Sequence, residues 1–359
     1  MTGNHTHQLF VSTRKGLFEL QRTGAGCWDI VRRHFLGEPV SIMLPDPHDH
    51  TLYAALALGH FGAKLHRSSD DGVSWEEIAA PSYAGIEGDP APSLKQIWCL
   101  EHGAAGTLWC GTIPGGLFKS TDRGSSWQLM QNLWNDPLRT QWFGGGYDQP
   151  GIHSICVDPR DCNRIAVAVS CGGVWLSDDN GEHWRISTTG MFADYMPPEQ
   201  RENPATQDPH RLVQCKSQPD HFWVQHHNGI FRSTNAGKNW EVVQAQPSCF
   251  GFAVAVHPRD ADTAWFVPAI KDEKRYPVDG KLVVTRTRDG GKTFTTLDKG
   301  LPQRDAYDLI YRHGLDVDAS GDHLAMGSTT GNLWLSENGG DAWTQFSSSL
   351  PPIYAVRFV

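Results

Sequence analysis

The chain has 359 residues, of which 39% are hydrophobic and 20% charged, and its formal net charge is -9. This acidic chain has no lysine/arginine cluster and so lacks the basic surface that phosphate binding needs, which argues against nucleic acid as a partner. No apolar run approaches the roughly 20 residues that span a bilayer. Residues 1–8 show no secretory signal, so we expect a cytoplasmic protein that contacts no membrane.

Taken in chain order, the first predicted elements are three short strands at 9–13, 16–20 and 28–31. They resemble the last three strands of a four-stranded unit whose first strand is missing. From residue 40 onward the chain repeats itself with a period of about fifty residues. Each repeat has strand-like runs, a glycine-containing octet and one more short strand. The final segment, 353–358, is a strand with no repeat after it.

Six octets of the form Ser/Thr-x-Asp/Asn-x-Gly-x-x-Trp/Phe mark the repeats, and they begin at Ser68, Ser120, Ser177, Ser233, Thr287 and Ser336. The third-position oxygen and the first-position hydroxyl can accept backbone N–H bonds within a turn. Glycine adopts backbone angles that a Cβ would forbid, and the closing aromatic residue packs between sheets. Each octet therefore predicts a tight turn between the third and fourth strands of a four-stranded antiparallel unit.

Four antiparallel strands at this period are typical of a β-propeller blade. Pairing the strand at 353–359 with the strands in 9–35 completes one further blade and removes two exposed sheet edges. The sequence therefore predicts an all-β, seven-bladed propeller with four strands per blade, closed by its two terminal segments. We expect residues 1–359 to form a single domain.

The octets resemble the Asp-box of BNR-repeat proteins, and the resemblance covers nearly the whole chain. It is similar to the WD40/YVTN/BNR-like propellers that include glycosyl hydrolases and exo-α-sialidases. The segments at 59–62, 225–229, 250–252, 286–302 and 329–331 resemble a bacterial subgroup of that class. The Asp-box is a folding motif, so it predicts the fold and leaves the activity open. True sialidase activity is not expected, because the arginine triad and the first-arginine Arg-Ile-Pro segment are missing.

Strand direction predicts where a functional site lies. Because successive strands alternate in direction, the octets share one end of the blades with the turns between first and second strands. The other connections lie at the opposite end. The long connections at 81–93, 134–151, 191–209 and 269–280 all belong to that opposite end. Long connections in compact domains are often functional, so we expect them to surround an axial site.

The strands deliver polar side chains to that end. Our candidate catalytic residues are His60, His153, His227 and Arg312, and our candidate substrate-binding residues are Lys64, Gln225, Trp98, Trp142, Arg275 and Tyr307. We place Arg312 inside an apolar first strand, at the level of His153, as an anion-binding residue or an ion-pair partner of Asp308 or Asp316. Trp98 and Trp142 can stack on a ligand or pack between blades.

Three interpretations of the histidines remain open. His60, His153 and His227 can together bind a divalent metal on the propeller axis. One of them can instead transfer protons at a carboxylate-bearing substrate, helped by Lys64 or Arg312. Each can also form only structural hydrogen bonds. The cofactor is therefore unknown, with a divalent metal as one alternative.

We predict a hydrolase or lyase that acts on a carbohydrate-like or carboxylated small molecule. The alternative is a non-catalytic propeller that uses the same end to bind a ligand or a protein. The eight cysteines contain no Cys-x-x-Cys pair, so neither a zinc knuckle nor a thioredoxin-like site is indicated. Most of them lie in apolar runs, where we expect buried, inert thiols.

Overall fold

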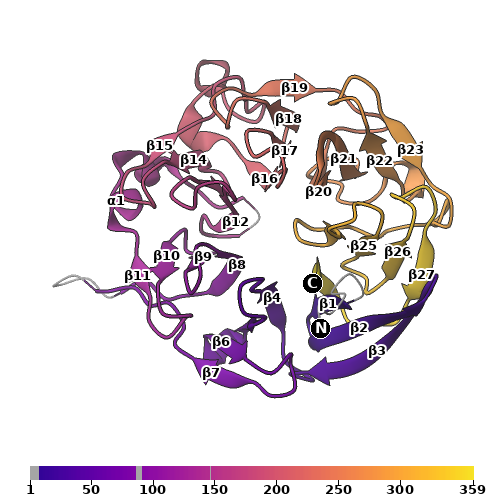
Figure 1. Cartoon of the computed structure of the whole chain (residues 1–359). Coiled ribbons are helices and arrows are strands. Elements are labelled where there is room, and N and C mark those ends of the chain that lie inside the picture. Colours follow the sequence, from indigo (N-terminus) through magenta and orange to yellow (C-terminus); the bar gives the residue numbers. More distant parts are fainter. Residues whose placement is uncertain (1–7, 86–90, 146) are drawn as a thin grey trace. The chain divides into compact units, whose positions relative to one another are not determined.

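A computed structural model describes residues 8–85, 91–145 and 147–359. The chain divides into two compact units, unit 1 (residues 1–37 and 210–359) and unit 2 (residues 38–209). The described residues form seven four-stranded antiparallel sheets (Figure 1). The fold class is therefore the seven-bladed β-propeller expected from the octet repeat. The single domain expected from the sequence stays a prediction.

Unit 2 contains blades 2, 3 and 4. Blade 2 consists of β4 (Val40–Pro45), β5 (Leu52–Ala57), β6 (Ala63–Ser68) and β7 (Glu76–Ile78). Blade 3 consists of β8 (Gln96–His102), β9 (Leu108–Ile113), β10 (Leu117–Ser120) and β11 (Gln128–Leu129). Blade 4 consists of β12 (Ile152–Val157), β13 (Ile165–Val169), β14 (Gly173–Ser177) and β15 (Arg185–Ile186).

Unit 1 contains the other four blades. Blade 5 consists of β16 (Pro209–Gln214), β17 (Phe222–His226), β18 (Gly229–Ser233) and β19 (Glu241–Val243). Blade 6 consists of β20 (Gly251–His257), β21 (Asp260–Pro268), β22 (Val284–Thr287) and β23 (Thr295–Leu297). Blade 7 consists of β24 (Leu315–Val317), β25 (Leu324–Gly327), β26 (Leu333–Ser336) and β27 (Thr344–Ser347).

Blade 1 is built from both ends of the sequence. It consists of β1 (Gln8–Thr13), β2 (Gly16–Gly24), β3 (Cys27–His34) and β28 (Ile353–Phe358). β28 pairs antiparallel with β1, so that Leu9 lies opposite Phe358 and Val11 opposite Val356. This sheet confirms the predicted closure by the terminal segments.

In the residues that the structure describes, helical structure is confined to short segments in the connections between strands. They are α1 (Gln131–Trp134), η1 (Gly59–Phe61), η2 (Pro137–Gln141), η3 (Pro198–Gln200), η4 (Pro204–Thr206) and η5 (Val278–Gly280). In the described ranges, no helix has the length and apolar character needed to cross a membrane. The long connections at 134–151 and 191–209 contain three of these helical turns, η2, η3 and η4. Residues 86–90 of the connection at 81–93 lie outside the described residues.

The octets form the expected turns. In blade 3 the Ser120 hydroxyl accepts the Gly124 amide at 2.8 Å, and the Asp122 carboxylate accepts the Ser126 amide at 2.9 Å. Gly124 has φ of +81°, a left-handed angle that favours glycine. Hydrogen bonds from Ser126 and Ser120 lower the pKa of Asp122 to about 2. Asn235 replaces the carboxylate in blade 5 and accepts the equivalent amide at 3.0 Å.

A repeated contact joins neighbouring blades of unit 1. Between blades 6 and 7, the Trp265 indole and the Arg286 guanidinium both donate to the Gly339 carbonyl, at 2.8 and 2.7 Å. Between blades 5 and 6, Arg232 donates to the Gly290 carbonyl at 3.0 Å. In both cases the acceptor carbonyl precedes the octet glycine. The octet is thus an intrablade turn and also an acceptor for the neighbouring blade.

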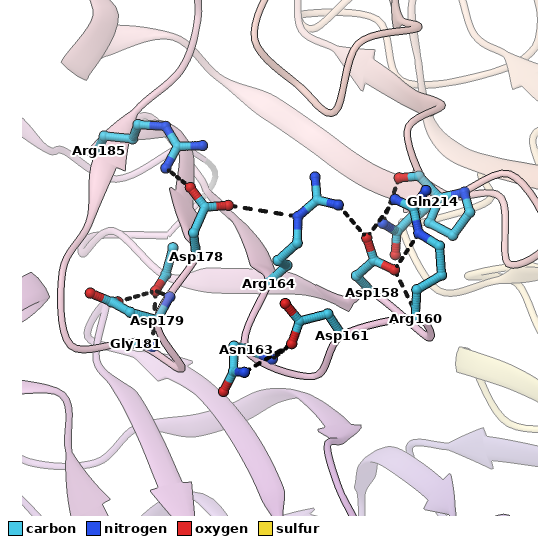
Figure 2. Close-up of polar contacts among 12 residues, drawn as sticks. Asp158, Arg160, Asp161, Asn163, Arg164, Asp178, Asp179, Gly181, Arg185 and Gln214 are labelled. Carbon is cyan, nitrogen blue, oxygen red and sulfur yellow. Dashed lines mark hydrogen bonds and ion pairs between the residues drawn. The ribbon is translucent and has the colours of Figure 1, made fainter.

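An arginine cluster in blade 4 is neutralised by aspartates of the same unit (Figure 2). Arg160 and Arg164 contact the Asp158 carboxylate at 2.8 and 3.0 Å, and Asp178 contacts Arg185 at 2.5 Å. Burial raises the pKa of Asp158, but hydrogen bonds and charge from Arg160 outweigh it and hold the pKa below 3.8. These ion pairs lie at the octet end of the blade, so we assign them a structural role.

Candidate functional site

A cluster of aromatic and cationic side chains in unit 1 centres on the ring of Phe252. Its residues lie at the starts of strands and in connections. Because successive strands alternate in direction, these positions lie at the end of the blades opposite the octets. Its members are His210 on β16, His227 in the β17–β18 turn, Phe250 and Phe252 at the start of β20, Arg275 in the β21–β22 connection, and Tyr311 and Arg312 before β24.

Two imidazoles lie together in this cluster. The His210 ring stacks on Phe252 with centroids 4.4 Å apart and an interplanar angle of 11°. The His227 ring lies 5.5 Å from the His210 ring, edge to face, and a nitrogen of each approaches the other within 4.8 Å. His210 is 2% exposed, whereas His227 is only partly buried. His227 is therefore the imidazole that a ligand reaches from outside.

The hydrogen bonding of His210 fixes its tautomer. Its Nδ1 lies 2.7 Å from the Gly251 carbonyl, which can only accept. Nδ1 therefore carries the proton, and Nε2 carries the lone pair when the ring is neutral. His210 thus joins blades 5 and 6 through its Nδ1.

Two guanidinium groups lie against the same Phe252 ring. The Arg275 Cζ is 5.4 Å and the Arg312 Cζ 5.5 Å from its centroid, within the range of cation–π contacts. Asp272 neutralises Arg275 at 2.5 Å. Arg312 is 7% exposed. Guanidinium groups match a carboxylate especially well, because both are planar and pair through two parallel hydrogen bonds.

Arg312 does not lie where the sequence placed it. The first strand of blade 7 was expected to include residue 312, but β24 begins at Leu315, so Arg312 precedes the strand. The two expected partners have other contacts: the Asp308 carboxylate accepts the Asn332 amide at 2.6 Å, and Asp316 accepts the Phe358 amide at 2.9 Å. The predicted strand position of residue 312 was wrong, because a run of apolar residues is also typical of an irregular buried segment.

Gln225 holds this part of the site in place. Its side-chain amide nitrogen donates to the carbonyls of Cys249 at 2.8 Å and Gly229 at 3.2 Å, and the residue is 1% exposed. These bonds tie the end of β17 to the segment that leads into β20. Gln225 therefore positions His227 and Phe250, while its predicted substrate contact stays a prediction.

His153 and the two tryptophans among our candidates lie in the interior of unit 2. His153 has no exposed surface, and its ring nitrogens lie 2.7 Å from the Pro209 carbonyl and 2.9 Å from the Ser154 hydroxyl. Trp98 packs edge to face on His153 at 5.3 Å, and Trp142 packs on Trp175 at 5.6 Å. This geometry favours the structural interpretation of all three; their predicted roles in catalysis or binding remain untested.

The remaining unit 2 candidates are exposed or ion-paired. His60 lies on η1, exposed and 5.5 Å from the ring of Phe61. The Lys64 ammonium contacts the Glu77 carboxylate at 2.7 Å. In unit 1 it is His210, absent from our candidates, that accompanies His227. Imidazole nitrogens suit divalent metals, so metal binding and proton transfer by this pair both stay predictions.

The sequence contained one signal for His210. It occupies the second position of its blade's first strand, as His153 does, and each histidine donates to the carbonyl that begins the first strand of the following blade. The shared position is visible in the sequence, whereas the shared hydrogen bond, which favours a structural role for both residues, is visible only in the structure. The stacking of Phe252 on His210 depends on the path of the chain before β20, which no motif encodes.

Comparisons with known proteins identify relatives of this fold. No protein-family profile matches the chain. The chain is 27% identical over 303 residues to a xyloglucanase from Paenibacillus sp., covering 77% of this chain. It spans only 27% of the length of that enzyme. The Asp-box family therefore stays a prediction.

Several solved structures resemble the chain. A GH74 xyloglucanase from Xanthomonas campestris matches with a TM-score of 0.62 and 17% identity, over 96% of this chain and 51% of that one. An ancestral GH74 enzyme matches with a TM-score of 0.61 and 18% identity, over 86% and 39%. YCF48 bound to a D1 peptide matches with a TM-score of 0.55 and 13% identity, over 86% and 81%. At these identities the likeness is one of fold.

The eight cysteines are all free thiols. Five of them are buried and Cys27 is exposed. Burial raises the pKa of the Cys110 thiol well above its ordinary value, so this side chain stays protonated and unreactive. This agrees with the inert thiols expected from the sequence.

Proposed function

We propose that the chain is an enzyme acting on a carboxylated, carbohydrate-like small molecule, with its site at the Phe252 cluster of unit 1. The observation that carries the proposal is the convergence of two guanidinium groups and the His210 imidazole on the buried Phe252 ring, with the His227 ring 5.5 Å from His210. In this arrangement Arg275 and Arg312 bind the carboxylate, and His227 transfers a proton at the adjacent carbon or oxygen. Similarity to a xyloglucanase supports the carbohydrate part of the proposal.

The side chains favour elimination over hydrolysis. Glycoside hydrolases generally use two carboxylic acids, whereas the titratable groups that contact the Phe252 ring are one imidazole and two guanidiniums. A carboxylate neutralised by arginine acidifies the neighbouring C–H bond. His227 can take that proton while a carbon–carbon double bond forms and the glycosidic C–O bond breaks. The departing alkoxide takes a proton from water, and the protonated His227 gives its proton to the hydroxide that remains, which balances the reaction.

The test is to incubate the protein with uronic-acid oligosaccharides and with neutral xyloglucan. We expect new reducing ends together with ultraviolet absorbance from an unsaturated product, from the acidic substrates only. Reducing ends without that absorbance would indicate hydrolysis. Arg312→Gln should weaken binding of the carboxylated ligand by at least about tenfold, the loss typical of one charge-assisted hydrogen bond. Failure of every acidic sugar to bind would refute the proposal.

A second candidate is a non-catalytic propeller that binds a peptide. The observation that favours it is the likeness to YCF48 bound to a D1 peptide, because the match covers most of both chains. Binding of a ligand without any turnover in the assay above would favour this alternative.

A further inference from the structure

Two tyrosine rings lie side by side near the Phe252 cluster. Tyr276 belongs to the β21–β22 connection and Tyr307 to the segment before β24, and their ring centroids are 6.0 Å apart. Tyr307 is 64% exposed. A large aromatic ring held in solvent forgoes the burial that aromatic side chains usually gain. These rings therefore need an explanation other than core packing.

The two segments that carry the rings are bonded to each other. The Ala306 amide donates to the Gly280 carbonyl at 3.0 Å, and the Leu282 amide donates to the Pro302 carbonyl at 3.0 Å. The Gln303 side chain adds a bond to the Leu282 carbonyl at 2.8 Å. Within the β21–β22 connection, the backbone carbonyl of Tyr276 accepts the Ile270 amide at 3.0 Å. The tyrosines are thus preorganised, which lowers the entropy cost of binding a ligand.

Each tyrosine is also linked through the chain to the cluster itself. Arg275, the neighbour of Tyr276, places its guanidinium against Phe252. Leu309, two residues after Tyr307, packs in the same buried group as Phe250 and Phe252. The two segments that carry the tyrosines thus also contribute Arg275, Tyr311 and Arg312 to the cluster, so a ligand longer than one sugar ring can contact both the tyrosine pair and the cluster.

We infer that Tyr276 and Tyr307 form an outer subsite that stacks on a second sugar ring, so that the substrate is an acidic oligosaccharide and not a free uronic acid. The inference rests on the proposed function. The apolar face of a sugar ring packs on an aromatic side chain, while hydroxyl groups at its edge stay hydrated. The carboxylated ring lies at the arginines, and the neighbouring ring lies on the tyrosine pair.

The test compares ligand length by calorimetry, using galacturonic acid and tri-galacturonic acid with the full chain. We expect the trimer to bind at least about tenfold more tightly than the monomer. Tyr307→Ala should lower trimer affinity by about threefold to tenfold, the range for loss of one ring stack, with monomer affinity unchanged. Tyr307→Phe, the matched control, keeps the ring and should stay within about twofold of wild type. Thermal melts check that both variants fold.

Equal affinity for monomer and trimer would overturn the inference and leave the proposed function standing, as would an unchanged trimer affinity in Tyr307→Ala. If neither acid binds, the inference and the proposed function both fail. If Arg312→Gln abolishes binding of galacturonic acid while Tyr307→Ala leaves that binding unchanged, the arginine site and the tyrosine pair are two distinct subsites.

Discussion

The contact between blades 6 and 7 gives a stability prediction with a definite size. Arg286→Met keeps the aliphatic stem and removes the guanidinium that donates to the Gly339 carbonyl at 2.7 Å. A hydrogen bond from a charged group contributes about 1.5–3 kcal/mol. The ion pair with Asp341, which is 54% exposed, adds at most about 0.5 kcal/mol after screening. In the part of the chain that the structure describes, the buried Arg286 Nε has no hydrogen-bond partner. Arg286→Met removes this unsatisfied donor and its desolvation cost, which offsets part of the lost stability.

The Trp265 indole limits how much stability Arg286→Met removes. Its indole N–H still donates to the Gly339 carbonyl at 2.8 Å, so the substitution leaves no buried acceptor unsatisfied. We therefore expect Arg286→Met to destabilise the protein by about 1–2 kcal/mol. Urea unfolding followed by tryptophan fluorescence measures this as a lower midpoint at unchanged slope. Lys292→Met, at an exposed position in the adjacent octet, is the control. A loss no larger than that of the control would refute the reasoning.

Three further predictions concern the site, the octets and the thiols. His227→Gln should reduce turnover of an acidic substrate by about 10²–10⁴-fold, with little change in ligand affinity, because it removes a proton-transfer group; an equal loss of both would contradict this role. Asp122→Asn should leave the urea midpoint at pH 7 unchanged, because Asn235 makes the same bond in blade 5, whereas Asp122→Ala should lower it. Folding lowers the pKa of Asp122 from 3.8 to about 2. The carboxylate's contribution to the free energy of unfolding is therefore complete above pH 3.8 and is lost as the pH falls through about 2. The Asn variant should lack this pH dependence of stability. A thiol reagent should label exposed Cys27 first and buried Cys110 only on unfolding; a Cys27→Ser variant that kept the fast phase would disprove the assignment.

The fold was predictable because the octet is a local motif. Its hydroxyl, carboxylate and glycine determine a turn within eight residues, and six copies then imply the blades and their closure. The site depends on contacts between distant segments. Phe252, His210 and Arg312 meet only because of how the connections at 269–283 and 301–314 fold, and no periodicity reports that path. His227, Arg312, Arg275 and Tyr307 were chosen from strand direction alone, and unit 1 brings all four to one region.

The composite sheet of β28 and β1–β3 has a consequence for biosynthesis. After β1 to β3 are synthesised, the backbone N–H and C=O groups along one edge of β1, from Leu9 to Thr13, stay unpaired until β28 leaves the ribosome. An unpaired strand edge is a template for aggregation, and late, long-range pairing is slow. The nascent chain therefore carries this unpaired edge until β28 has been synthesised. A circular permutant that makes β28 and β1 contiguous should refold faster than the natural order.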